Sequence, residues 1–220
     1  MCDIVDYMPY RKTNFANFGF YHVFNRGVEK RQIFLTDYDR SRFMQTLFYY
    51  QFSGPKPKFS TYKRFRSQDF DKNPKVIEVI CYCLMPNHFH LLLKQLNDGG
   101  VQEFIRKVSN SYSKYFNTKN KRVGPLFQGE FKAVAIETDE QLMHVSRYIH
   151  LNPYVSGLVK DLKDFRYSSY LDFLGLRSNT LCNKEAVLNF FKSPKNYEYF
   201  VSDQESYALE LERIKHLIID

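Results

Sequence analysis

Several features that would assign this 220-residue sequence to other classes of protein are missing from it. No apolar run approaches the roughly 20 residues that a helix needs to cross a bilayer. The first residues lack the basic-then-apolar order of a signal peptide. The sequence also lacks the Gly-x-x-x-x-Gly-Lys-Ser/Thr loop that cradles nucleotide phosphates. These absences predict a cytoplasmic protein with no membrane partner and no nucleotide cofactor.

Cysteine pairs and acidic trios are missing as well. The four cysteines, at positions 2, 81, 83 and 182, show no Cys-x-x-Cys spacing, and free thiols in a reducing cytosol are the simplest account. No three acidic residues fall at convincing strand and helix positions, which disfavours a site built from three carboxylates.

The charge of the chain is unevenly distributed. The formal net charge is +8, yet residues 198–220 carry six acids and two bases, so the remainder of the chain carries +12. With 17 tyrosines and 21 phenylalanines, this basic body suits a polyanion with stackable bases, in particular single-stranded nucleic acid. Composition alone leaves open a basic soluble protein with an aromatic core.

The central motif is a predicted β-hairpin that carries a His-x-His pair. A β-branched apolar run over residues 76–84 and a second run over 85–94 meet at a Pro-Asn turn. Side chains alternate along a strand, so His88 and His90 are expected on the same face, in a geometry that can hold a metal ion. Two histidines without a ligand are the alternative, because such pairs are frequent.

The register of this hairpin follows from charge pairing. A pairing of Lys94 with Glu78 across the hairpin gains roughly 0.2–1 kcal/mol. This register sets His90 opposite Tyr82 and places Cys81 and Cys83 on the other, apolar face. A slip of one residue would move the cysteines beside the histidines and create a zinc-like cluster. We expect the first register, because the slip breaks the charge pair.

The order of predicted elements is β-α-β-β-α-β. Strands are expected at residues 19–27, 76–84, 85–94 and 131–136, and helices at 34–52, with Thr36 or Asp37 as cap, and at 101–117. This order is typical of the α+β ferredoxin-like fold, an antiparallel sheet with helices on one face and the other face free. We expect an N-terminal arm over residues 1–17, the domain itself over 18–155, and a helical C-terminal extension over 156–220 that includes helices at 183–191 and 207–219.

A third helix carries a polar row. Thr138 opens a capping box, after which His144, Tyr148 and Asn152 follow at four-residue spacing on one side of the helix. If this helix lies beside the hairpin, the row approaches His88 and His90. Because Asn152 precedes a proline, we expect it at the frayed end of the helix.

Four segments together resemble one known family. They are residues 21–27, 84–90, 124–129 and 148–153, and with the sequence between them they extend over about residues 19–175. The sequence resembles the REP-associated tyrosine transposases, relatives of the single-strand insertion-sequence transposases in the HUH superfamily. The resemblance implies a monomeric or homodimeric enzyme that nicks and rejoins single-stranded, hairpin-forming DNA.

The resemblance also implies roles for individual residues. His88, His90 and Asn152 would bind a divalent metal, Mg²⁺ or Mn²⁺, and Tyr148 would be the nucleophile that forms a covalent 5′-phosphotyrosine. The sequence departs from the family pattern at Glu130, where a basic residue is expected, so a DNA contact there is in doubt. The predicted DNA-binding residues are the cations of the loops and strand ends: Arg26, Lys63, Arg64, Lys119, Lys121 and Arg122.

The chemistry explains why such residues are needed. Only about one phenol in a thousand is ionised at neutral pH, so a metal, nearby cations or a base must assist Tyr148; His144 and His150 are candidate bases by their nearness in sequence alone. Attack by a phenol conserves the ester bond energy, so rejoining needs no nucleotide. Tyr112 and Tyr115 are rival nucleophiles, but they fall on an apolar stripe and are expected in the core.

Two other functions remain open from the sequence. One is a catalytically silent nucleic-acid-binding protein on the same fold, and the other is a metallohydrolase in which water attacks directly. Replacement of Tyr148 by phenylalanine separates all three, because only a tyrosine enzyme loses covalent attachment to DNA while it still binds.

Overall fold

The fold is built on one antiparallel sheet. A computed structural model describes residues 13–54, 58–65 and 70–203, with side chains omitted at 63–65 and 70. The strands are β1 (Phe20–Arg26), β2 (Ile77–Met85), β3 (His88–Gln95) and β4 (Lys132–Ile136), in the order β2-β3-β1-β4. This order confirms the α+β class and the ferredoxin-like β-α-β-β-α-β arrangement.

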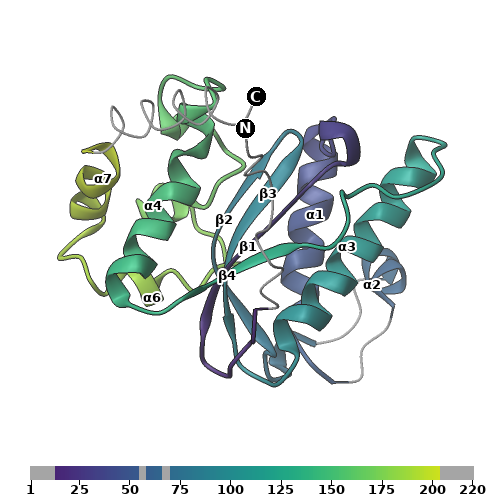
Figure 1. Ribbon diagram of the computed structural model, residues 1–220, viewed down its shortest axis with the longest axis horizontal. Coiled ribbons are helices and arrows are strands. Elements are labelled where there is room, and N and C mark those ends of the chain that lie inside the picture. The colour runs from purple at the N-terminus through teal and green to yellow at the C-terminus, as the bar shows by residue number, and fades with distance from the viewer. Residues whose placement is uncertain (1–12, 55–57, 66–69, 204–220) are drawn as a thin grey trace, which may run out of the picture.

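Seven α-helices accompany the sheet within the described residues. They are α1 (Asp37–Tyr50), α2 (Phe59–Phe65), α3 (Gly100–Lys119), α4 (Asp139–Val155), α5 (Tyr170–Phe173), α6 (Glu185–Leu188) and α7 (Pro194–Ser202). In Figure 1, α1 and α3 lie on one side of the sheet, and α4, α6 and α7 lie on the other. None of the helices in the described part of the chain combines the length and the apolar character that crossing a membrane requires.

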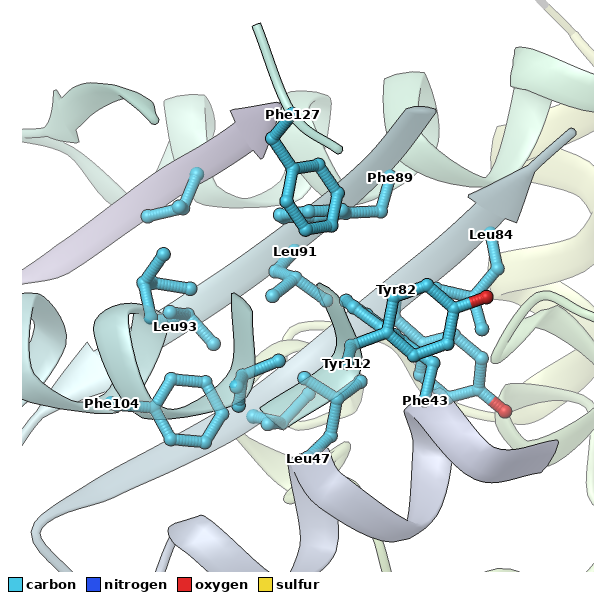
Figure 2. Packing of buried hydrophobic residues seen from close by; sticks show 14 of the residues in the cluster. Phe43, Leu47, Tyr82, Leu84, Phe89, Leu91, Leu93, Phe104, Tyr112 and Phe127 are labelled. Atoms are coloured by element: carbon cyan, nitrogen blue, oxygen red, sulfur yellow. The ribbon is translucent and has the colours of Figure 1, made fainter. Parts of the chain in front are cut away.

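The larger core lies between the sheet and the pair α1 and α3. Figure 2 shows Phe43 of α1 and Phe104 and Tyr112 of α3 packed against Phe89 and Leu91 of β3. Thr36, one of the two caps predicted for α1, is the residue that caps it. The cap is a capping box, in which the side chain of the third helical residue also accepts from the backbone of the cap. The apolar stripe expected on the helix predicted at residues 101–117, which is α3, therefore packs against the sheet.

The second face of the sheet was predicted to be free of helices. It is instead covered by α4 and the segments that follow it. Ile80 of β2 and Leu92 of β3 pack there with Ile149 of α4, Phe173 of α5 and Val187 of α6. The cover follows from the composition of the central strands, which are apolar on both faces. The C-terminal helical extension is present up to residue 203, and its boundary with the preceding domain stays a prediction.

A β-bulge changes the register that we predicted for the hairpin. Glu78 lies opposite Lys94 as expected, but a shift between Val79 and Cys81 inserts one extra residue, so that Cys83 lies opposite His90. The predicted pairing of Tyr82 with His90 is therefore wrong. One inserted residue exchanges the two faces of the strand beyond it, and Tyr82 packs on the side of α1 and α3.

The cysteines beside the histidines do not form a metal site. Among the described residues, no group of three or more His, Cys, Asp or Glu side chains has a geometry that can hold a metal ion. Complete burial raises the pKa of the Cys83 thiol far above its ordinary value, so the thiol stays protonated. Cys83 is a packing residue of the second face.

The segment that contains α5, residues 167–183, is joined to the sheet by its backbone. Leu84 N donates to Tyr167 O at 2.9 Å, Ser169 N to Tyr82 O at 3.0 Å, and Asn183 N to Val79 O at 2.8 Å. These bonds cover the outer edge of β2, which would otherwise expose unpaired backbone groups.

His150 ties this segment to α4. Its Nδ1 lies 2.7 Å from Tyr197 Oη of α7, and its Nε2 lies 2.8 Å from Ser169 Oγ. The ring is fully buried, and burial lowers its pKa to about 3. His150 is therefore a neutral, structural histidine.

Some sequence expectations fall on helix α2 or outside the described residues. Lys63 and Arg64 lie on α2, where a loop was expected, and their side chains are outside the description. Most of the predicted N-terminal arm and the helix predicted at 207–219 also lie outside it.

The depressed pKa of His150 predicts a pH-dependent contribution to stability. In the unfolded chain this histidine takes up a proton below about pH 6.5, whereas in the folded chain it stays neutral down to about pH 3. The free energy of unfolding should therefore fall on acidification by about 1.4 kcal/mol per pH unit from this group. Urea unfolding of wild type and His150→Leu from pH 7 to 4.5 should show the difference between them shrinking at that rate below pH 6; a pH-independent difference would contradict it.

Candidate active site

Three histidines and Tyr148 meet on the second face of the sheet. Ring centroids lie 4.9 Å apart for His88 and His90, 5.1 Å for His22 and His90, 5.6 Å for His90 and Tyr148, and 5.7 Å for His22 and Tyr148. His22 comes from β1, the paired histidines from β3 and the tyrosine from α4. Elements distant in sequence thus assemble one cluster of imidazoles and a phenol.

The orientation of the His88 ring is set by the turn residue before it. His88 Nδ1 lies 2.6 Å from Asn87 Oδ1, and Asn87 Nδ2 donates to Lys30 O at 3.3 Å. Since the amide oxygen only accepts, Nδ1 of His88 carries the proton. The lone pair of His88 is then on Nε2, the nitrogen available to a metal.

The His90 ring is held in a similar way, by another histidine. His90 Nδ1 lies 2.9 Å from His22 Nε2, and the two rings are stacked at 23°. Phe24, directly across the strand pair from His90, packs against both rings. Nε2 of His90 is therefore the nitrogen on the side away from His22.

Burial keeps two imidazoles of this cluster neutral, those of His22 and His88. It lowers the pKa of His22 to about 4, and it lowers that of His88 to about 4 with a smaller contribution from the positive charge of Arg26. Neutral imidazole is the form that ligates metals. At neutral pH His88 could therefore bind a cation without first losing a proton.

Tyr148 is partly open to solvent. Its side chain is 43% exposed, and its ring stands edge-on to the rings of His90 and His22. The buried residues Leu142 and Ile149 fix α4 on the sheet. The phenol is thus positioned at the surface, where a large substrate can reach it.

Asn152 lies one turn after Tyr148, within the helix. The helix continues through Pro153 to Val155, so the predicted position of Asn152 at a frayed end is wrong. Its Nδ2 donates to Tyr148 O at 2.7 Å, which leaves Oδ1 as the atom for a ligand. None of the contacts described for Asn152 joins its side chain to His88 or His90.

The donor set fits a divalent cation. Two imidazole nitrogens are ligands for many divalent ions, zinc, nickel and copper among them, and such a pair would leave positions open for an amide or phosphate oxygen and for water. Because the ligands are uncharged, the charge of the ion is not neutralised by them.

The rival nucleophiles and candidate bases lie elsewhere. Tyr112 Oη donates to Ile33 O at 2.5 Å and Tyr115 Oη to Asp39 at 2.7 Å, so both belong to the core, as expected. His144 is exposed, with its Nδ1 2.6 Å from an Arg147 nitrogen. With His150 buried against α7, none of the interactions described for either candidate base includes Tyr148.

Two of the predicted DNA-binding cations have structural partners. Lys119 Nζ lies 2.6 Å from the buried carboxylate of Asp39, joining α3 to α1. Arg122 donates to Asn117 Oδ1 at 2.7 Å and to Pro125 O at 3.1 Å, which shapes the loop after α3.

Arg26 and Lys121 are more open to a partner. Both are exposed. Arg26 lies across the strand pair from His88, and its Nε donates to Gln128 at 2.5 Å. Glu130, where the family pattern departs, is exposed on the loop before β4.

His22 is the site residue that sequence reasoning missed. The residue is buried, with 9% exposed. Strand alternation predicts which residues of β1 share its face, but the pairing of β1 with β3 was needed to place it beside His90.

Comparisons with known proteins agree with this geometry. Residues 66–152 match the model of the family described as "Transposase IS200 like". A protein of Haemophilus influenzae named "Putative REP-associated tyrosine transposase" is 28% identical over 103 residues, which cover 42% of this chain and 58% of that protein. The present chain thus spans less than two thirds of that relative's length.

A solved structure extends the similarity to the fold. The structure of a REP-associated tyrosine transposase bound to a REP hairpin aligns with 80% of this chain and 98% of its own, at 14% identity and a TM-score of 0.55. The segment matched by the family model contains both histidines of β3, Tyr148 and Asn152. Over residues 66–152 this chain is similar to the IS200-like transposases, and the predicted resemblance to REP-associated tyrosine transposases is confirmed.

Proposed function

We propose that this protein is a DNA transposase that nicks and rejoins single-stranded, hairpin-forming DNA through a covalent bond to Tyr148. The observation that carries the proposal is the edge-on contact of the Tyr148 ring with His90, at 5.6 Å, beside the second histidine of the pair. The similarity to IS200-like transposases supports DNA as the substrate.

The metal ligands in this proposal are Nε2 of His88, Nε2 of His90 and Oδ1 of Asn152. These atoms would hold Mg²⁺ or Mn²⁺, which would polarise the scissile phosphate and offset its negative charge. The hydrogen bonds at Nδ1 of the two histidines orient both rings for this task.

Tyr148 performs the bond exchange. Its phenolic oxygen attacks the phosphorus, the bond from phosphorus to the 3′ oxygen breaks, and that oxygen takes a proton from solvent and leaves as a 3′ hydroxyl. The phenol proton passes to solvent, which reaches this half-exposed side chain. The product is a 5′-phosphotyrosine, and attack by a 3′ hydroxyl on it reverses the step and rejoins DNA.

The partner is single-stranded or hairpin DNA, bound by a monomer or homodimer. The net charge of +8 favours such a polyanion. The solved relative is a transposase bound to a REP hairpin, and we propose a hairpin substrate of the same kind here.

Removal of the Tyr148 hydroxyl should abolish covalent attachment. Incubation with pooled single-stranded hairpin oligonucleotides and Mn²⁺ should give wild type an adduct that survives denaturing electrophoresis and maps to Tyr148. Tyr148→Phe should form none and should bind DNA with unchanged affinity. Tyr154→Phe, on the same helix, is the matched control and should form the adduct.

The outcomes separate the alternatives. Cleavage by Tyr148→Phe at the wild-type rate would contradict the proposal and favour attack by water. Binding without cleavage by the wild type, across the pool and with either metal, would favour a silent binding protein.

The paired histidines should be required for metal-dependent cleavage. His88→Ala and His90→Ala should each lower the cleavage rate by roughly 100-fold or more, because the charge stabilisation supplied by a metal is worth several kcal/mol. His144→Ala removes an exposed histidine from α4 and should cleave like wild type. Equal rates in all three variants would argue against a metal at the pair.

Exposed cations should contribute to DNA affinity without sequence preference. Lys121→Ala should weaken binding to all oligonucleotides alike and lower the slope of log K against log salt by about one. Titrations at several salt concentrations measure this slope. An unchanged slope would remove Lys121 from the DNA interface.

A further inference from the structure

We propose that His22 is a positioning residue that holds His90 in the tautomer required of a metal ligand. This inference rests on the proposed metal site and assigns a role to the one histidine of the cluster that the chemistry above does not use. Its basis is the contact of 2.9 Å between His22 Nε2 and His90 Nδ1.

The contact allows two proton arrangements with opposite consequences. If His90 Nδ1 carries the proton, it donates to His22 Nε2, and Nε2 of His90 has a lone pair for a metal. If His22 Nε2 carries the proton, it donates to His90 Nδ1, and the proton of His90 is on Nε2, where it blocks the metal. Only the first arrangement permits ligation, so His22 must act as the acceptor.

The fold prepares His22 for this role. Its strand is paired with β3, so the backbone positions of the two histidines are fixed by the same ladder. Its ring is stacked on that of His90, and Phe24 packs against both. An acceptor on a central strand keeps its position better than one on a loop.

The second ligand shows the same arrangement with a different acceptor. His88 Nδ1 is paired with the amide oxygen of Asn87, at 2.6 Å. Each candidate ligand therefore has an acceptor at Nδ1, which directs Nε2 to the metal. Second-shell acceptors of this kind typically change metal affinity 10–100-fold when removed.

The test compares metal affinity in variants of residue 22 that remove the acceptor atom, keep it near the position of His22 Nε2, or place it too far from His90. Mn²⁺ titrations without DNA, followed by electron paramagnetic resonance, measure the dissociation constant apart from activity. His22→Leu removes the acceptor and should weaken Mn²⁺ binding roughly 10–100-fold. His22→Gln places an amide oxygen near the former Nε2 and should restore affinity, whereas the shorter His22→Asn should not.

A second readout needs no metal. In ¹⁵N-histidine spectra of the apo protein, His90 should be protonated at Nδ1 in wild type and in His22→Gln. In His22→Leu and His22→Asn, a substantial fraction of His90 should be protonated at Nε2. Phe24→Leu removes a ring from the same cluster but leaves the hydrogen bond, so its affinity and its His90 tautomer should match wild type.

Each outcome has a distinct meaning. Wild-type affinity in both His22→Leu and His22→Asn, with His90 still protonated at Nδ1, would overturn the role of His22 and leave the metal site standing. If wild type binds Mn²⁺ independently of His88 and His90, the proposed site fails and this inference fails with it. Should His22→Leu not fold, equal affinity of the Gln and Asn variants would overturn the proposal.

Discussion

The packing of α4 across the second face of the sheet is the interaction on which the candidate site depends. Leu142 and Ile149 of the helix are buried against Ile80 of β2 and Leu92 of β3. Without this contact the tyrosine would be an ordinary exposed side chain, and the paired histidines would stand alone on a strand. Apolar contacts distant from the candidate site thus determine whether Tyr148 lies beside the paired histidines.

Burial then fixes the chemical state of the site. It lowers the pKa of His22 and His88, so that both are neutral over the physiological range. A hydrogen-bond contact at Nδ1 of each of the paired histidines aligns its ring. The site is therefore prepared electrostatically and geometrically before any substrate arrives, which reduces the reorganisation needed in the reaction.

Much of the fold follows from local sequence signals. The strand β1, the Pro-Asn turn and the helix cap at Thr36 each depend on neighbouring residues, and each is present where predicted. The bulge near Ile80 was not predictable in this way, because charge pairing at Glu78 favours a continuous ladder and nothing local marks the inserted residue. Its effect was to exchange the faces of the strand beyond it, and with them the position of Tyr82.

The candidate site, too, was predictable only where local spacing determines it. The spacing of His88 and His90 places both on one face, and the spacing of the helical row singles out Tyr148. To predict that His22 belongs to the site, one must know how β1 pairs with β3. To predict that Lys119 pairs with Asp39, one must know how α1 packs on α3. Contacts between distant segments are the part that a single sequence does not reveal.

The central claim is that a divalent cation binds at the paired imidazoles next to the reactive phenol. Anomalous scattering from crystals soaked in Mn²⁺ tests it directly. The account predicts one strong peak within bonding distance of Nε2 of both His88 and His90, on the side that Tyr148 faces. A peak elsewhere, or none at a metal concentration that supports cleavage, would contradict it.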